Sequence, residues 1–127
     1  MAQTVCALFD VRRDPTTPRV AAGIALFLIA MIFWLWARAA LGDAFAQLAR
    51  VPGRLVTAGP YRLVRHPLYT ATAVGCMGQA WAGGSLRGIA IWFALALILG
   101  FRARREDALM RQAFGSTWIS WSSQARA

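Results

Sequence analysis

Apolar residues of this chain gather in three runs, and charged residues lie between them. The first run carries no charge from Val20 to Ala37 and is bounded by Arg19 and Arg38. At about 1.5 Å per residue, a helix of this length reaches about 27 Å, close to the hydrocarbon thickness of a bilayer. A buried core helix would need a large soluble protein around it. The pattern therefore predicts a first membrane helix over residues 19–38.

The second and third runs are shorter and are separated by a glycine turn. Gly-Gly-Ser at residues 83–85 interrupts the second run, which predicts a helix over residues 68–82. Ser85 is a good N-cap for a third helix over residues 86–101. Because both are shorter than a comfortable span, we expect a tight, tilted or incompletely spanning hairpin over residues 66–101. Small residues that permit close contact between these helices lie along the second run: Ala71, Gly75 and Gly78.

The polar segments complete an all-α fold. Glycine and proline recur over residues 41–65, which predicts an ordered loop. The charged tail, residues 102–127, continues the third helix, and Gly115 is placed as its C-terminal cap. Its aromatic and apolar residues are expected at the membrane surface: Trp118, Ile119 and Trp121. We predict a polytopic integral membrane protein with about three membrane helices, a C-terminal amphipathic interfacial helix, a leader at residues 1–19 and a single domain at residues 20–127.

The charge pattern agrees with a membrane protein and sets its orientation. The 127 residues are 58% hydrophobic with mean hydropathy +0.48, and net charge +9 comes from 14 basic residues that are all arginine. These flank apolar runs, which argues against a nucleic-acid partner. If the first and third helices end on one side, that side holds ten arginines: Arg38, Arg50, Arg54, Arg62, Arg65, Arg102, Arg104, Arg105, Arg111 and Arg126. The other side holds four: Arg12, Arg13, Arg19 and Arg87. The excess predicts a cytoplasmic loop and tail.

Polar chemistry is concentrated at two places on that predicted cytoplasmic side. The segment GPYRLVRHPLY, residues 59–69, contains both tyrosines and the chain's one histidine, and its prolines stiffen the backbone. Arg102 and Glu106 lie one turn apart on the third helix. An arginine that precedes a glutamate by four residues is the weaker ion-pair order, which slightly favours a ligand role. With one histidine and two distant cysteines, we expect no metal site.

These segments together resemble a family of integral membrane enzymes. GRLVTAGPYRLVRHPLY, then a short helical hairpin, then RARREDALMRQAFGSTW is similar to the isoprenylcysteine carboxyl methyltransferase and phospholipid methyltransferase superfamily. The resemblance implies methyl transfer from S-adenosylmethionine, bound in a cytosol-facing pocket that opens to lipid. The implied acceptor is a lipophilic small molecule or a lipid-modified carboxylate, amine or thiol. Membrane lipids are the other implied partner.

The resemblance also implies roles for particular residues. Glu106 is implied in both catalysis and cofactor binding, and Arg102 is implied to face the acceptor. The implied cofactor contacts are Arg54, Leu55, Val56, Tyr61, His66, Pro67, Leu68, Tyr69 and Glu106. The chemistry is suitable, because the cofactor's carboxylate, ammonium and sulfonium groups need donors, a carboxylate and electron-rich faces.

Other interpretations stay open at this point. His66 would cap the second helix, or Tyr61 and Tyr69 would be interface anchors, if the motif served structure alone. We expect Arg62 and Arg65 to bind lipid phosphate or to set the topology instead of contacting a reacting group. Asp107 has no assigned role. A membrane NADPH-dependent, sterol-reductase-like enzyme and a non-catalytic membrane scaffold are the alternative functions. Only one predicted helix precedes the motif, which leaves open an incomplete pocket wall or one completed in a homo-oligomer.

Overall fold

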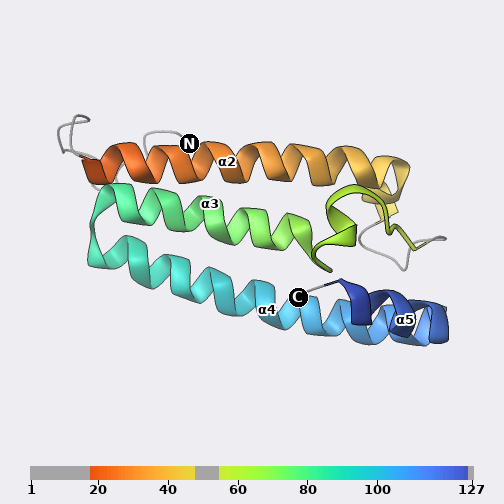
Figure 1. The fold of residues 1–127 in the computed structure, drawn as a ribbon. Coiled ribbons are helices and arrows are strands. Elements are labelled where there is room, and N and C mark those ends of the chain that lie inside the picture. Colours follow the sequence, from red (N-terminus) through yellow and green to blue (C-terminus); the bar gives the residue numbers. More distant parts are fainter. Residues whose placement is uncertain (1–17, 48–54, 126–127) are drawn as a thin grey trace.

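The computed structural model describes residues 18–47 and 55–125, and these residues form helices without a strand. The elements in chain order are α2 (Pro18–Leu41), the short 3₁₀ helices η1 (Gly42–Gln47) and η2 (Gly59–Arg62), α3 (Pro67–Gly83), α4 (Leu86–Phe114) and α5 (Ser116–Gln124). In Figure 1, α3 lies between α2 and α4, and α5 packs against the end of α4. The predicted all-α class is confirmed, and the second helix begins and ends one residue beyond its predicted bounds.

Glycines allow α2 and α3 to cross with their backbones in contact. A Cβ atom added at Gly78 would lie 2.6 Å from the carbonyl oxygen of Gly23, and one added at Gly23 would lie 2.5 Å from the carbonyl oxygen of Gly78. Gly75 faces the side chains of Phe27 and Ala30. We expected these small residues to pack the second helix against the third. That prediction was wrong for Gly75 and Gly78, because the face of α3 that carries them packs on α2. The interface of α3 with α2 is also larger than its interface with α4.

A two-residue turn connects α3 to α4. Gly84 has φ +59°, a left-handed conformation that favours glycine, and its N–H donates to the Ala80 carbonyl. The Ser85 hydroxyl accepts from the N–H of Gly88 at 3.0 Å, so its predicted role as N-cap is confirmed. Along the pair, the indole N–H of Trp92 donates to the Ala73 carbonyl at 2.8 Å. The bond satisfies a polar group that would otherwise face an apolar environment.

Two of the described helices, α2 and α4, are long and apolar enough to cross a membrane. Their surfaces remain largely apolar in the folded chain, since Ile32 and Leu97 are more than three-fifths exposed. Exposed apolar surface on this scale suits a lipid environment. A span by α3, and hence the three-span topology, stays a prediction because α3 is only 17 residues long.

The charged tail has a different packing from the one we predicted. α4 continues without a break through Arg102 to Phe114, and Gly115, with φ +52°, ends it as expected. Trp118, however, is 2% exposed beneath the guanidinium of Arg111, and the indole N–H of Trp121 donates to the Tyr61 carbonyl at 3.1 Å. Trp118 is therefore an internal packing residue instead of a surface anchor, whereas Trp121 is half-buried and Ile119 is exposed. For these last two, a position at the membrane surface stays a prediction.

Candidate functional site

Buried prolines and an aromatic ring fix the corner between η2 and α3. Pro60 and Pro67 are fully buried, and each sits at the start of its helix, where a missing N–H costs nothing. Tyr61 is 8% exposed and packs with Ala37 and Leu41 of α2. A fixed φ angle and a buried ring at this corner hold the first residues of α3 in one orientation.

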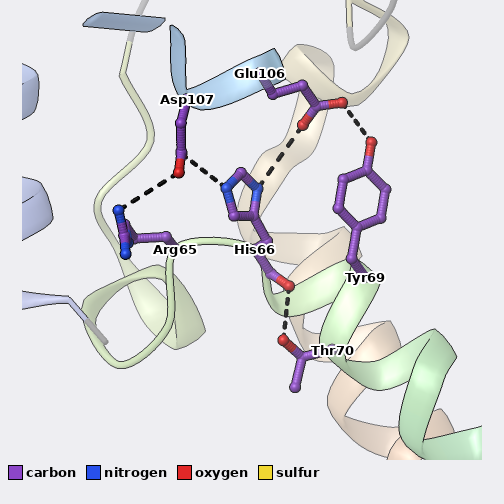
Figure 2. Close-up of polar contacts among 6 residues, drawn as sticks. All are labelled: Arg65, His66, Tyr69, Thr70, Glu106 and Asp107. Atoms are coloured by element: carbon purple, nitrogen blue, oxygen red, sulfur yellow. Dashed lines mark hydrogen bonds and ion pairs between the residues drawn. The ribbon is translucent and has the colours of Figure 1, made fainter. Parts of the chain in front are cut away.

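His66 stands at the N-cap position of α3, but its ring does not cap the helix. Its backbone carbonyl accepts from the Thr70 hydroxyl at 3.0 Å, while no side-chain cap bond forms. The imidazole instead lies between two carboxylates of α4 (Figure 2): Nε2 is 2.8 Å from Asp107 Oδ1, and Nδ1 is 3.8 Å from Glu106 Oε2. This arrangement decides against the interpretation of His66 as a simple helix cap.

The two consecutive acidic residues of α4, Glu106 and Asp107, lie on opposite sides of the His66 ring, and each also contacts a second residue. The Tyr69 hydroxyl donates to Glu106, and Arg65 Nη1 donates to Asp107 Oδ2 at 3.4 Å. Figure 2 shows one continuous polar chain from Arg65 through Asp107, His66 and Glu106 to Tyr69. Since adjacent residues on a helix point about 100° apart, a pair of neighbours can contact both sides of one imidazole.

Aromatic faces and a cation lie next to this chain. The rings of His66 and Tyr69 are stacked, with centroids 5.8 Å apart and an interplanar angle of 16°. The guanidinium of Arg102 lies 5.9 Å from the centre of the Tyr69 ring, within cation–π range. Arg102 is exposed, whereas Glu106 is half-buried. The cluster therefore has a half-buried anionic part and an exposed cationic edge.

Burial and charge keep the nearby phenol protonated. Burial raises the pKa of Tyr61 well above its usual value, and the charge of Glu106 and the neighbouring Tyr69 raise it further. Removing a proton from Tyr61 would place a second negative charge beside a carboxylate in a poorly solvated place. Tyr61 therefore keeps its hydroxyl proton at physiological pH and stays a hydrogen-bond donor.

One donor in the cluster has no partner in the described residues. Arg65 Nε is buried, yet no protein acceptor lies within hydrogen-bond distance. Buried polar atoms are paired in most structures, so an unpaired one at a cluster of charges is consistent with a ligand site. No set of three histidine, cysteine or acidic side chains arranged to bind a metal occurs in the part of the chain that the structure describes.

The structure brings three of the nine predicted cofactor residues into this cluster, namely His66, Tyr69 and Glu106. Tyr61 lies next to them, and Arg102, which was predicted to face the acceptor, lies over the ring of Tyr69. Val56 and Leu68 pack on the apolar cluster around Tyr61, and Pro67 is a buried helix start, so these three support the site from behind. Leu55 is half-buried without a polar contact, and Arg54 lies outside the described residues.

Two residues of the cluster, Asp107 and Arg65, were not predicted as part of the site. Asp107 had no assigned role, and it is the residue that joins His66 to Arg65. Arg65 was expected to bind lipid phosphate or to set topology, and both expectations stay predictions; the structure adds its pairing with Asp107. The adjacent carboxylates Glu106 and Asp107 are a sequence signal for a polar site. Only the fold shows that Arg65 and His66 contact them.

The fold and the cluster together define a class of protein. An all-helical chain with two membrane-length apolar helices and a polar cluster at one end has the features of a membrane protein with a site near the membrane surface. The profile of the family described as phospholipid methyltransferase matches residues 18–117. The chain belongs to this family and is a membrane protein.

A comparison with curated proteins gives a partial match. The chain is 44% identical over 62 residues to the cobalt-zinc-cadmium resistance protein CzcN of Cupriavidus metallidurans. The match covers 47% of this chain and 28% of the relative, so the chain spans little more than a quarter of that protein. No solved structure gives a significant match.

Proposed function

We propose that this protein transfers a methyl group from S-adenosylmethionine to a lipophilic or membrane-delivered acceptor at the cytoplasmic face of the membrane. The family supports methyl transfer. The observation that carries the proposal for this chain is the contact between the segment containing His66 and Tyr69 and the carboxylates of Glu106 and Asp107. Two segments far apart in sequence thereby contribute to one polar site beside apolar helices.

The chemistry of the cluster fits this cofactor. Each oxygen of Glu106 and Asp107 has one polar neighbour, and a carboxylate oxygen can accept more than one hydrogen bond. These carboxylates would hold an ammonium group or ribose hydroxyls. The unpaired Arg65 Nε would bind a carboxylate, and the stacked faces of His66 and Tyr69 would favour a sulfonium cation or an adenine ring.

When bound, S-adenosylmethionine supplies a methyl group activated by a positive sulfur atom. The residues of this chain would then act by position and by electrostatics, because methyl transfer from a cation needs alignment and the exclusion of water more than acid catalysis. Tyr61, Pro60 and Pro67 hold the corner that aligns the cluster, and their burial excludes water from behind it.

The acceptor would meet the cluster at its exposed cationic edge. Arg102, over the outer face of Tyr69, would orient an anionic or polar group of the acceptor. A carboxylate acceptor is already a nucleophile, whereas an amine or thiol must first lose a proton. Glu106 lies one turn from Arg102 and would hold the cofactor's amine or accept that proton.

The arginine distribution supports the cytoplasmic orientation. The end of the bundle that holds the cluster also carries Arg38, Arg62 and the arginines of α4 from Arg102 to Arg111, whereas Arg19 and Arg87 lie at the other end. Positive charge beside membrane helices is retained in the cytoplasm. Fusing a reporter enzyme to the C-terminus would test this orientation.

Calorimetry tests the cofactor assignment. The purified protein in detergent is titrated with S-adenosylhomocysteine and, separately, with NADPH. We expect binding of S-adenosylhomocysteine and none of NADPH. Binding of NADPH alone would replace the proposal with the reductase, and a folded protein that binds neither would be a scaffold. Lipid extracts incubated with methyl-labelled cofactor would then identify the acceptor.

A further inference from the structure

The tetrad Arg104, Arg105, Glu106 and Asp107 separates its charges around α4. The two carboxylates point toward the corner of α3, where they contact Tyr69, His66 and Arg65. At about 100° per residue, Arg104 lies about 160° from Glu106, and Arg105 lies about 100° from it on the side away from Asp107. Both arginines are exposed. One turn of helix therefore has an anionic inner side and a cationic outer side.

The cationic side has no compensating acid in the described residues. Neither Arg104 nor Arg105 forms a hydrogen bond or ion pair there, because the acidic residues of this helix are turned inward. The only other acidic residue that the structure describes, Asp43, lies in η1. Two adjacent guanidinium groups that form no ion pair with the carboxylates beside them attract an anion from outside the chain.

The apolar surface below these arginines shows which environment they meet. Phe101 is 65% exposed and Leu97 is 61% exposed, and the helical period places both on the outer side of α4 with the two arginines. The apolar part of the helix, residues 86–101, is about 24 Å long, slightly less than the hydrocarbon thickness. Arg104 and Arg105 would thus lie within one turn of the headgroup layer, and their long side chains reach it easily.

From this placement, we propose that Arg104 and Arg105 form a binding site for an anionic phospholipid, whose phosphodiester the paired guanidinium groups contact while its acyl chains lie along Phe101 and Leu97. Guanidinium groups bind phosphate oxygens in a bidentate manner, and a headgroup with net negative charge adds attraction that a zwitterionic one lacks. The site is outside the proposed cofactor cluster and does not depend on methyl transfer.

Lipid competition with matched arginine variants tests the site. The purified protein in detergent is mixed with phosphatidylglycerol or with phosphatidylcholine of the same acyl chains, and retained lipids are counted by native mass spectrometry. Wild-type protein is expected to retain several-fold more phosphatidylglycerol, and its thermal midpoint should rise only with that lipid. The double variant R104Q/R105Q should lose the preference.

Arg87 provides the control, because it is an exposed arginine at the opposite end of the same helix. R87Q is expected to keep the preference for phosphatidylglycerol. Equal retention of both lipids by wild-type protein, or an unchanged preference in R104Q/R105Q, would overturn the proposal. A thermal shift of the same size with inorganic phosphate would also overturn it, because the site would then recognise a free anion without its lipid.

Discussion

The two ends of α3 are held by different kinds of contact. In the C-terminal half of α3, Gly78 lies so close to Gly23 of α2 that neither position has room for a Cβ atom. At its N-terminal end, His66 and Tyr69 contact α4 through carboxylates and a hydroxyl group. The first contact is apolar and depends on shape, whereas the second is polar and half-exposed.

The difference separates the parts of the molecule that make the fold from those that make the site. The backbone contact at Gly78 packs α3 against α2 and involves no charged or reactive group. At the other end, charged groups are kept together at a cost in desolvation, which a purely structural contact would avoid. Stability is therefore expected to depend mainly on the glycine contact, and ligand binding mainly on the polar cluster.

The largest effect is expected from filling the glycine contact. Gly78→Leu places a side chain where the Gly23 carbonyl and the Phe27 N–H already lie, at 2.6 and 3.0 Å from the added Cβ atom. We expect a loss of about 3 kcal/mol or more, seen as little folded protein in detergent by gel filtration. Gly100→Leu is the matched control, because nothing lies within 4 Å of a Cβ atom there. Equal yields of the two variants would contradict the packing argument.

Glu106→Gln should separate ligand binding from folding. The substitution keeps the size of the side chain but removes the charge that faces His66 and accepts from Tyr69. Hydrogen bonds to charged groups contribute about 1.5–3 kcal/mol, so we expect methyl transfer to fall about tenfold to hundredfold. The thermal midpoint should change little. Unchanged kcat/KM would show that Glu106 is a structural residue only.

A smaller effect is expected at Asp107, which acts through His66 and Arg65. Asp107→Asn should lower S-adenosylhomocysteine affinity by about tenfold, because a neutral amide holds the imidazole and guanidinium less firmly. Asp107→Glu keeps the charge and should recover part of the affinity. Calorimetry on both variants is the measurement, and identical losses would show that charge at this position does not matter.

The smallest effect is expected at Trp121, which packs against the corner between η2 and α3. Trp121→Phe retains an aromatic ring but removes the N–H that donates to the Tyr61 carbonyl. We expect a loss of about 1 kcal/mol in stability, measured as a lower thermal midpoint, with unchanged S-adenosylhomocysteine affinity. If affinity fell and stability did not, the contact would belong to the site and not to the fold.

The sequence predicted the helices well because their signals are local. Gly-Gly-Ser at residues 83–85 ends one helix and starts another, and Gly115 ends α4, through backbone conformations that neighbouring residues determine. The partner of the glycine face could not be predicted in the same way. Gly75 and Gly78 indicate close packing, but nothing local says whether α2 or α4 provides it.

The site was predicted in part for a similar reason. His66, Tyr69 and Glu106 were identified from motifs, whereas the contact between Asp107 and Arg65 joins residues 42 positions apart. Trp118 was misjudged because an interfacial tryptophan and a buried one look alike in sequence. Only the return of α5 onto the corner places Trp121 next to Tyr61.

One measurement tests the central claim that the cluster around His66 binds the cofactor. S-adenosylhomocysteine is titrated into wild-type protein, His66→Ala and Arg62→Ala, the last being an exposed neighbour on the same corner. We expect binding by wild-type protein and Arg62→Ala, and a loss of about tenfold or more for His66→Ala at an unchanged thermal midpoint. Equal affinity in all three proteins would contradict the assignment of the site.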